Sequence, residues 1–167
     1  YKRQNVSIAS DYIWRGMTQT DGIAVSGGFD YAADSGFYAG IWGSNVNFND
    51  STGEGNGAEF DYYLGYGFEM GGIGVDLGYV MFDYPGNNDG LDFEEIVLGL
   101  SMGDLGLTFA SGVDGAPDYT EVSYGVGPIG VSYGQYDDYG DNIAISYGFS
   151  CGTCLLYTSP SPRDLST

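Results

Sequence analysis

The chain has 167 residues, a formal net charge of −19 at pH 7 and no histidine. This acidity argues against nucleic-acid binding, because affinity for phosphates comes from Lys and Arg. Without histidine the commonest general base and metal ligand is missing, so we expect no catalytic residue, no metal site, no cofactor and no enzymatic activity. The aromatic content of 16% and the 30 glycines exclude a disordered acidic tail and favour one folded domain.

The periodicity predicts an all-β fold. No helical period occurs, and segments of about 8–12 residues alternate bulky with small residues between Gly, Asp, Asn and Pro. No run of about 18 apolar residues is present, so no transmembrane helix is expected. In chain order, the predicted strands are Val6–Met17, Ile23–Tyr31, Gly36–Val46, Glu59–Glu69, Ile73–Tyr84, Leu91–Met102, Leu105–Val113, Asp118–Val126, Ile129–Tyr136 and Asp141–Ser150.

The connections between these strands alternate in length. Tight links (AADS, MGG, GD and GP) alternate with links that are mostly longer and rich in acidic residues, Asn or Gly. An up-and-down barrel in the outer membrane has this pattern, with short periplasmic turns and longer outer loops. We therefore predict an antiparallel, up-and-down transmembrane β-barrel.

The two faces of the predicted strands differ in character. In Ile73–Tyr84 the odd positions are mostly large and apolar, whereas Gly74, Asp76 and Gly78 occupy the other face. In a membrane barrel the bulky face meets lipid and the small, polar face lines the lumen. Ordinary core packing is the alternative for the aromatic residues. The aromatic side chains predicted to face lipid or to form girdles near strand ends are Tyr12, Trp14, Tyr66, Phe68, Tyr79, Tyr84, Tyr119, Tyr133, Tyr147 and Phe149.

The stretch Ser10–Gly22 (SDYIWRGMTQTDG) holds Arg15, the only basic residue between Arg3 and Arg163. If Tyr12 and Trp14 face lipid, alternation turns Arg15 toward the lumen, where an isolated charge is costly and needs a partner. Two interpretations stay open: a cation-preferring pore, or a structural plug in a closed barrel. By the same alternation, the predicted lumen charge cluster is Asp11, Arg15, Asp30, Asp61, Asp76, Glu95 and Glu121.

Ser10–Gly22 and the following stretch Val25–Phe48 resemble the TorF-like porins, conserved Gram-negative proteins also called the Gcw_chp family. The resemblance implies an outer-membrane barrel and a pore, with no catalytic residue and no defined substrate. Family members run longer, so we expect about ten strands present of twelve and a final hairpin missing after Ser150. The matching residues are Ser10, Asp11, Tyr12, Trp14, Arg15, Gly16, Gln19, Thr20, Gly28, Phe29, Asp30, Tyr31, Ser35, Gly36, Tyr38, Gly40, Trp42, Ser44, Asn45 and Val46.

Together these features predict an outer-membrane porin of a Gram-negative bacterium, with an acidic, cation-preferring lumen for small polar or cationic solutes. The expected partners are outer-membrane lipid and lipopolysaccharide, and the sequence does not indicate an oligomeric state. The alternative is a non-conducting outer-membrane barrel with a structural or surface-interaction role.

The end of the chain has a different composition. Residues 1–150 form the predicted barrel domain, whereas residues 151–167 lose the Gly/Tyr alternation after Gly152 and contain both cysteines. Residues 154–164 (CLLYTSPSPRD) resemble a translated sequencing adapter, so we expect a non-native tail. The spacing of Cys151 and Cys154 alone could indicate redox or zinc chemistry, but no second cysteine pair supports it.

Overall fold

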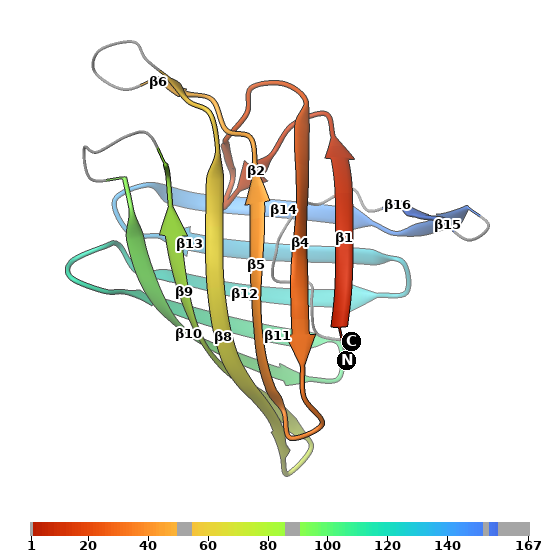
Figure 1. Ribbon diagram of the computed structural model, residues 1–167. Helices are drawn as coiled ribbons and strands as arrows, with labels where there is room; N and C mark the ends of the chain where they lie inside the picture. Colours follow the sequence, from red (N-terminus) through yellow and green to blue (C-terminus); the bar gives the residue numbers. More distant parts are fainter. Residues whose placement is uncertain (1, 50–54, 86–90, 152–153, 157–167) are drawn as a thin grey trace.

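The computed structural model describes residues 2–49, 55–85, 91–151 and 154–156 (Figure 1). Its main feature is a ten-stranded antiparallel sheet in which each strand pairs with the next sheet strand along the chain. Among the described residues no helix is long and apolar enough to cross a membrane. The strands of this main sheet are β1 (Lys2–Ala9), β4 (Ala24–Ala32), β5 (Phe37–Ser44), β8 (Glu59–Met70), β9 (Ile73–Asp83), β10 (Phe93–Met102), β11 (Leu105–Gly112), β12 (Tyr119–Val126), β13 (Ile129–Tyr136) and β14 (Gly140–Tyr147).

Three short hairpins stand apart from the main sheet. They are β2 (Ile13–Trp14) with β3 (Met17–Thr18), β6 (Phe48–Asn49) with β7 (Gly55–Asn56), and β15 (Phe149–Cys151) with β16 (Cys154–Leu156). The last hairpin spans the boundary predicted at residue 151 and adds no strand to the main sheet.

The predicted fold class is confirmed, and every predicted strand after the first coincides with an observed strand to within a few residues. Glycine-rich turns account for the tight links. Gly71 and Gly72, between β8 and β9, have φ angles of 63° and 81°, as the favoured two-residue hairpin turn requires. The first predicted strand, Val6–Met17, is wrong: β1 ends at Ala9, and the chain then turns inward.

The sheet curls around an interior. Strands β1, β4, β5 and β8 run across the front in Figure 1, β12, β13 and β14 cross behind them, and β9 and β10 lie between the two groups. The accumulated twist of neighbouring strands produces this curl, which is consistent with a barrel. In the described part of the chain no hydrogen-bonded ladder joins β1 to β14. The transmembrane character of the sheet stays a prediction.

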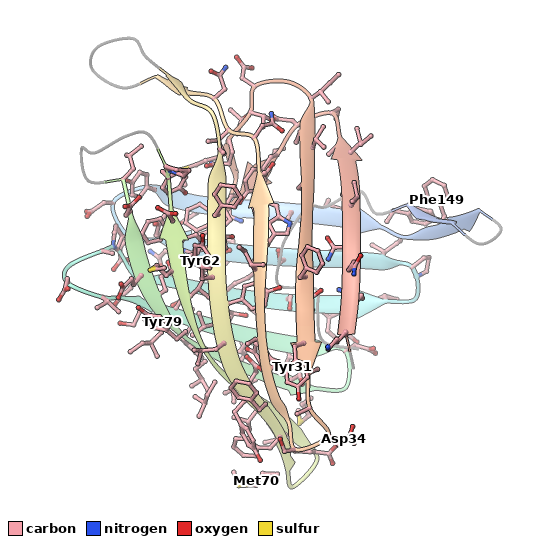
Figure 2. The ribbon with its side chains drawn as sticks, viewed as in Figure 1. Tyr31, Asp34, Tyr62, Met70, Tyr79 and Phe149 are labelled. Atoms are coloured by element: carbon pink, nitrogen blue, oxygen red, sulfur yellow. The ribbon has the colours of Figure 1, made fainter. Side chains whose placement is uncertain are left out.

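Large apolar side chains lie on the outer surface of the sheet. Val6 is 82% exposed and Ile143 is 74% exposed, whereas acidic residues such as Glu59 and Glu95 are buried. Figure 2 shows Tyr62 on β8 and Met70 at the turn at the lower end. Because side chains alternate along a strand, one face of each strand is bulky and the other is small or acidic. On β8 the outer residues are Phe60, Tyr62, Leu64, Tyr66 and Phe68.

The aromatic residues predicted to face outward divide into two groups. Tyr66, Phe68, Tyr79, Tyr133, Tyr147 and Phe149 follow the outer phase of their strands, and all but Tyr79 have large exposed fractions. The prediction is wrong for Tyr12, Trp14, Tyr84 and Tyr119. Tyr84 and Tyr119 belong to the inner phase, and Tyr12 and Trp14 belong to the inward-turned segment after β1.

Glycines on the inner face make room for large side chains that cross the interior. A Cβ atom at Gly40 would overlap the ring of Tyr63, whose hydroxyl donates a hydrogen bond to Asp30. A Cβ atom at Gly125, on the inner phase of β12, would meet no atom within 4 Å.

We expect Gly40→Ala to lower the free energy of unfolding by about 1–3 kcal/mol, because the Tyr63 ring has to move.

Urea-induced unfolding of the protein refolded in detergent measures this change. The matched control, Gly125→Ala, should leave the unfolding midpoint nearly unchanged. Equal midpoints for the two variants would show that Tyr63 has free space at Gly40.

Candidate functional site

The segment of residues 10–22, here called the inner hairpin, connects β1 to β4 through the interior of the curled sheet. Its short strands β2 and β3 pair Trp14 with Met17, and a two-residue turn at Arg15 and Gly16 joins them. Arg15 (φ 48°) and Gly16 (φ 81°) are both left-handed, as this turn type requires. A Cβ atom at Gly16 would lie 2.6 Å from Cβ of Asn142 on β14, so the tip reaches the strand at the opposite edge of the sheet.

Arg15 forms a buried, forked ion pair with Glu95 of β10. Its Nη1 lies 2.6 Å from Glu95 Oε1 and its Nη2 lies 2.8 Å from Oε2, with side chains only 3% and 0% exposed. The guanidinium carbon also lies 4.2 Å from the centre of the Trp14 ring and 4.1 Å from that of Tyr119. Charge-assisted paired hydrogen bonds and cation–π contacts are strongest where water is excluded.

Trp14 joins the two buried clusters of the interior. Its ring centre lies 5.7 Å from that of Phe82 on β9, 5.9 Å from that of Phe93 on β10 and 5.4 Å from that of Tyr136 on β13. It packs against both clusters of buried apolar residues. The inner hairpin therefore ties the front of the curled sheet to its back.

Tyr12 secures the base of the inner hairpin. It is 1% exposed, lies edge-on against Trp42 with ring centres 5.2 Å apart, and donates a 2.9 Å hydrogen bond to Glu59 Oε1. The backbone N–H of Gln19 donates to its carbonyl oxygen across the hairpin. The alternation that would have turned Tyr12 toward lipid fails because the segment is a hairpin and not part of a continuous strand.

Asp11 does not join Arg15. The hydroxyl groups of Thr18 and Thr20 each donate a 2.7 Å hydrogen bond to its carboxylate at the base of the inner hairpin. These hydrogen bonds, first that of Thr18, hold the pKa of Asp11 below its ordinary value because they favour the charged form. Asp11 therefore fixes the shape of the hairpin and contributes nothing to the Arg15 ion pair.

The other predicted lumen residues are separate carboxylates, most of them with their own donor. Tyr38 donates to Asp76 and Tyr119 donates to Glu121, at 2.7 and 2.8 Å. Asp30 accepts from Tyr63, Asn5 and Arg3. Within the described ranges no group of three or more Asp, Glu or Cys side chains is placed to hold a metal ion.

The sequence-based cluster missed Glu59. This residue lies two positions before Asp61 on the same face of β8, and both are buried. The alternation that placed Asp61 inside would also have placed Glu59 inside. Its pairing with Tyr12 could not be predicted while Tyr12 was assigned to the outer face.

Removing the charge of Arg15 should be far more harmful than removing that of Arg3. Arg15→Ala leaves Glu95 buried without its cation, so we expect a loss of about 3–5 kcal/mol in the free energy of unfolding. Arg15→Met with Glu95→Leu should recover most of this loss, because no charge is left buried. Urea unfolding in detergent measures both changes.

Arg3→Ala is the matched control, because Arg3 pairs with Asp30 but its side chain is 41% exposed. We expect it to cost less than about 1 kcal/mol. If Arg15→Ala and Arg3→Ala had the same free energy of unfolding, the buried ion pair between Arg15 and Glu95 would not stabilise the protein as we expect.

Comparison with known proteins places the chain in a family. The sequence model of the family described as "Bacterial protein of unknown function (Gcw_chp)" matches residues 3–136. A search of curated proteins found no significant match, and a search of solved structures found none either. The matched span runs from β1 to the end of β13 and contains the inner hairpin together with Glu59 and Glu95. The protein therefore belongs to the Gcw_chp family.

Proposed function

We propose that the protein is a β-barrel of the Gram-negative outer membrane whose lumen is closed by the inner hairpin. The observation that carries this proposal is the inverted polarity of the sheet. Large apolar side chains cover its outer surface, while an ion pair and several carboxylates lie inside. In water such a surface would favour aggregation, whereas lipid would cover it favourably.

Lipid and lipopolysaccharide are the proposed partners of the outer surface. Tight turns such as Gly71–Gly72 lie at one end of the curled sheet, and the longer connections lie at the other end of the front strands (Figure 1). We assign the tight turns to the periplasmic side and the longer, acidic connections to the outside, as in other barrels of this kind.

The packing of the inner hairpin supports a closed lumen. Trp14 and Arg15 fill the space between β9, β10, β12 and β13 with rings and a forked ion pair. An ion would have to displace these groups to pass. This favours the structural plug over a permanently open pore, and it makes the barrel non-conducting while the hairpin is seated.

A second candidate function is a cation-preferring channel that opens when the inner hairpin leaves. The carboxylates of Asp30, Asp76 and Glu121 support it, because they lie on the inner phase among small residues such as Gly78 and Gly99. Carboxylates along a narrow path favour cations over anions. Small polar or cationic solutes are the corresponding proposed substrates.

Planar-bilayer recording tests both functions. We expect the native protein to show few openings, because the hairpin blocks the lumen. Arg15→Ala should conduct in a cation-selective manner, because the buried Glu95 carboxylate loses its cation, draws water in and frees the hairpin. Reversal potentials in a salt gradient measure the selectivity. The Arg15→Met, Glu95→Leu variant is the matched control and should remain closed.

Each result has a separate meaning. Steady conductance of the native protein would contradict the plug. Absence of conductance, or anion preference, in Arg15→Ala would contradict the cation channel. Failure of the native protein to float with lipid vesicles would contradict the membrane barrel itself.

A further inference from the structure

The groups that the sheet presents to Arg15 recognise a guanidinium in two ways. Glu95 accepts from both ends of the fork, at 2.6 and 2.8 Å. The guanidinium carbon lies 4.1 Å from the centre of the Tyr119 ring and 4.7 Å from that of Tyr136. A planar cation with paired donors suits this set better than an ammonium group, because it serves both carboxylate oxygens and also stacks on rings.

The sheet holds these groups in place by contacts that do not involve Arg15. The rings of Tyr119 and Tyr136 lie edge-on to each other, with centres 6.0 Å apart, and Tyr136 also stacks on Tyr139 at 4.8 Å. The Tyr119 hydroxyl donates a 2.8 Å hydrogen bond to Glu121. Glu95, Tyr119 and Tyr136 belong to β10, β12 and β13, so the strand ladders fix their backbones. A ligand would therefore meet rings and a carboxylate that are already arranged for it.

Arg15 itself occupies this place under constraint. It sits in the turn of the inner hairpin with a φ of 48°, which costs free energy for a residue other than glycine. Its Nε is buried and has no acceptor among the described residues. Beside the same turn, the buried Oδ1 of Asn142 has no donor in the described part of the chain. An untethered guanidinium needs no strained turn and is free to choose its direction, so it fits the same groups at a lower conformational cost.

We propose that Glu95, Tyr119 and Tyr136 form a binding site for small ligands that carry a guanidinium group, and that Arg15 is its tethered occupant. Carboxylates on the inner face, such as Asp76, attract a cationic ligand toward this guanidinium site. The inference rests on the proposed function, because a ligand reaches the site through the lumen that the inner hairpin closes. It names guanidinium compounds as the solute class of the second candidate function.

The tether sets how strongly a free ligand must bind. A group that the chain holds next to its site acts at an effective concentration of about a millimolar or more. Methylguanidinium has few atoms with which to make contacts, so we expect an affinity in the millimolar range. It therefore does not displace Arg15 from the native protein. A ligand that makes further contacts in the lumen is needed for that.

Chemical rescue of Arg15→Ala tests the site. This variant removes the tethered guanidinium and keeps the carboxylate and both tyrosine rings, so methylguanidinium should enter the vacated space. At roughly ten times its dissociation constant, we expect it to raise the urea midpoint of Arg15→Ala in detergent by about 0.5 M. The midpoint of the native protein should not change, because Arg15 already fills the site.

Two controls separate the fork from general effects of a cation. Tetramethylammonium at the same concentration should give a much smaller shift, because it can lie against the rings but has no donor for Glu95. In Arg15→Ala with Glu95→Gln, the space remains but the charge is gone, so methylguanidinium should not shift the midpoint. If Arg15→Ala refolds in low yield, the refolded fraction replaces the midpoint as the readout, and methylguanidinium should raise it.

The results bear separately on the site and on the channel. The guanidinium site would be overturned if methylguanidinium did not stabilise Arg15→Ala, if tetramethylammonium stabilised it equally, or if the variant with Glu95→Gln responded equally. In planar bilayers, methylguanidinium should also block the cation current of Arg15→Ala. A rescued variant that never conducts would support the site and contradict the channel. A conducting variant that methylguanidinium neither stabilises nor blocks would overturn the site and support the channel.

Discussion

The buried ion pair between Arg15 and Glu95 is the constraint on which the interior depends. A lone carboxylate with no exposed surface on β10 would be costly, and so would a lone guanidinium inside the sheet. Each charge is tolerated because the other is held at hydrogen-bonding distance. Holding it there requires the two-residue turn at Arg15 and Gly16, in which Arg15 has an unfavourable positive φ. The shape of the inner hairpin and the aromatic contacts around Arg15 are the ones that hold this pair together.

The acidity of the chain has a structural explanation that composition does not suggest. A net charge of −19 first points to a pore that attracts cations. In the structure, however, Asp76, Glu59 and Glu121 each accept a hydrogen bond from a tyrosine hydroxyl. Tyrosine is well suited to this role, because its long ring spans the interior and its hydroxyl donates at the far end. Glycines on the facing strands leave the necessary space, as Gly40 does for Tyr63. Tyr12, Tyr38 and Tyr119, together with glycines such as Gly40, therefore serve the carboxylates inside.

The sequence predicted the sheet well and the inner hairpin poorly. The nine later strands were predictable because strict alternation and short glycine turns are local signals, as in Ile73–Asp83. The same alternation gave a wrong prediction at Ser10–Gly22. The spacing of Tyr12, Trp14 and Arg15 fits one long strand of the main sheet, but it fits the short strands of a hairpin inside the sheet equally well. Glycine after Arg15 was the available sign of a turn. The partner of Arg15 could not be predicted, since Glu95 lies 80 residues away and only the curl of the sheet brings them together.

This separation in sequence has a consequence for how the chain folds. The inner hairpin lies near the amino terminus, yet it contacts β10, β12, β13 and β14, which are synthesised later. Contacts of such long range form slowly, because the entropy of closing a large loop is lost before the contact forms. We therefore expect the strands from β4 onward to pair before Arg15 reaches Glu95. On this expectation the hairpin packs late in assembly, and its contacts form only in a sheet that has curled with the correct register.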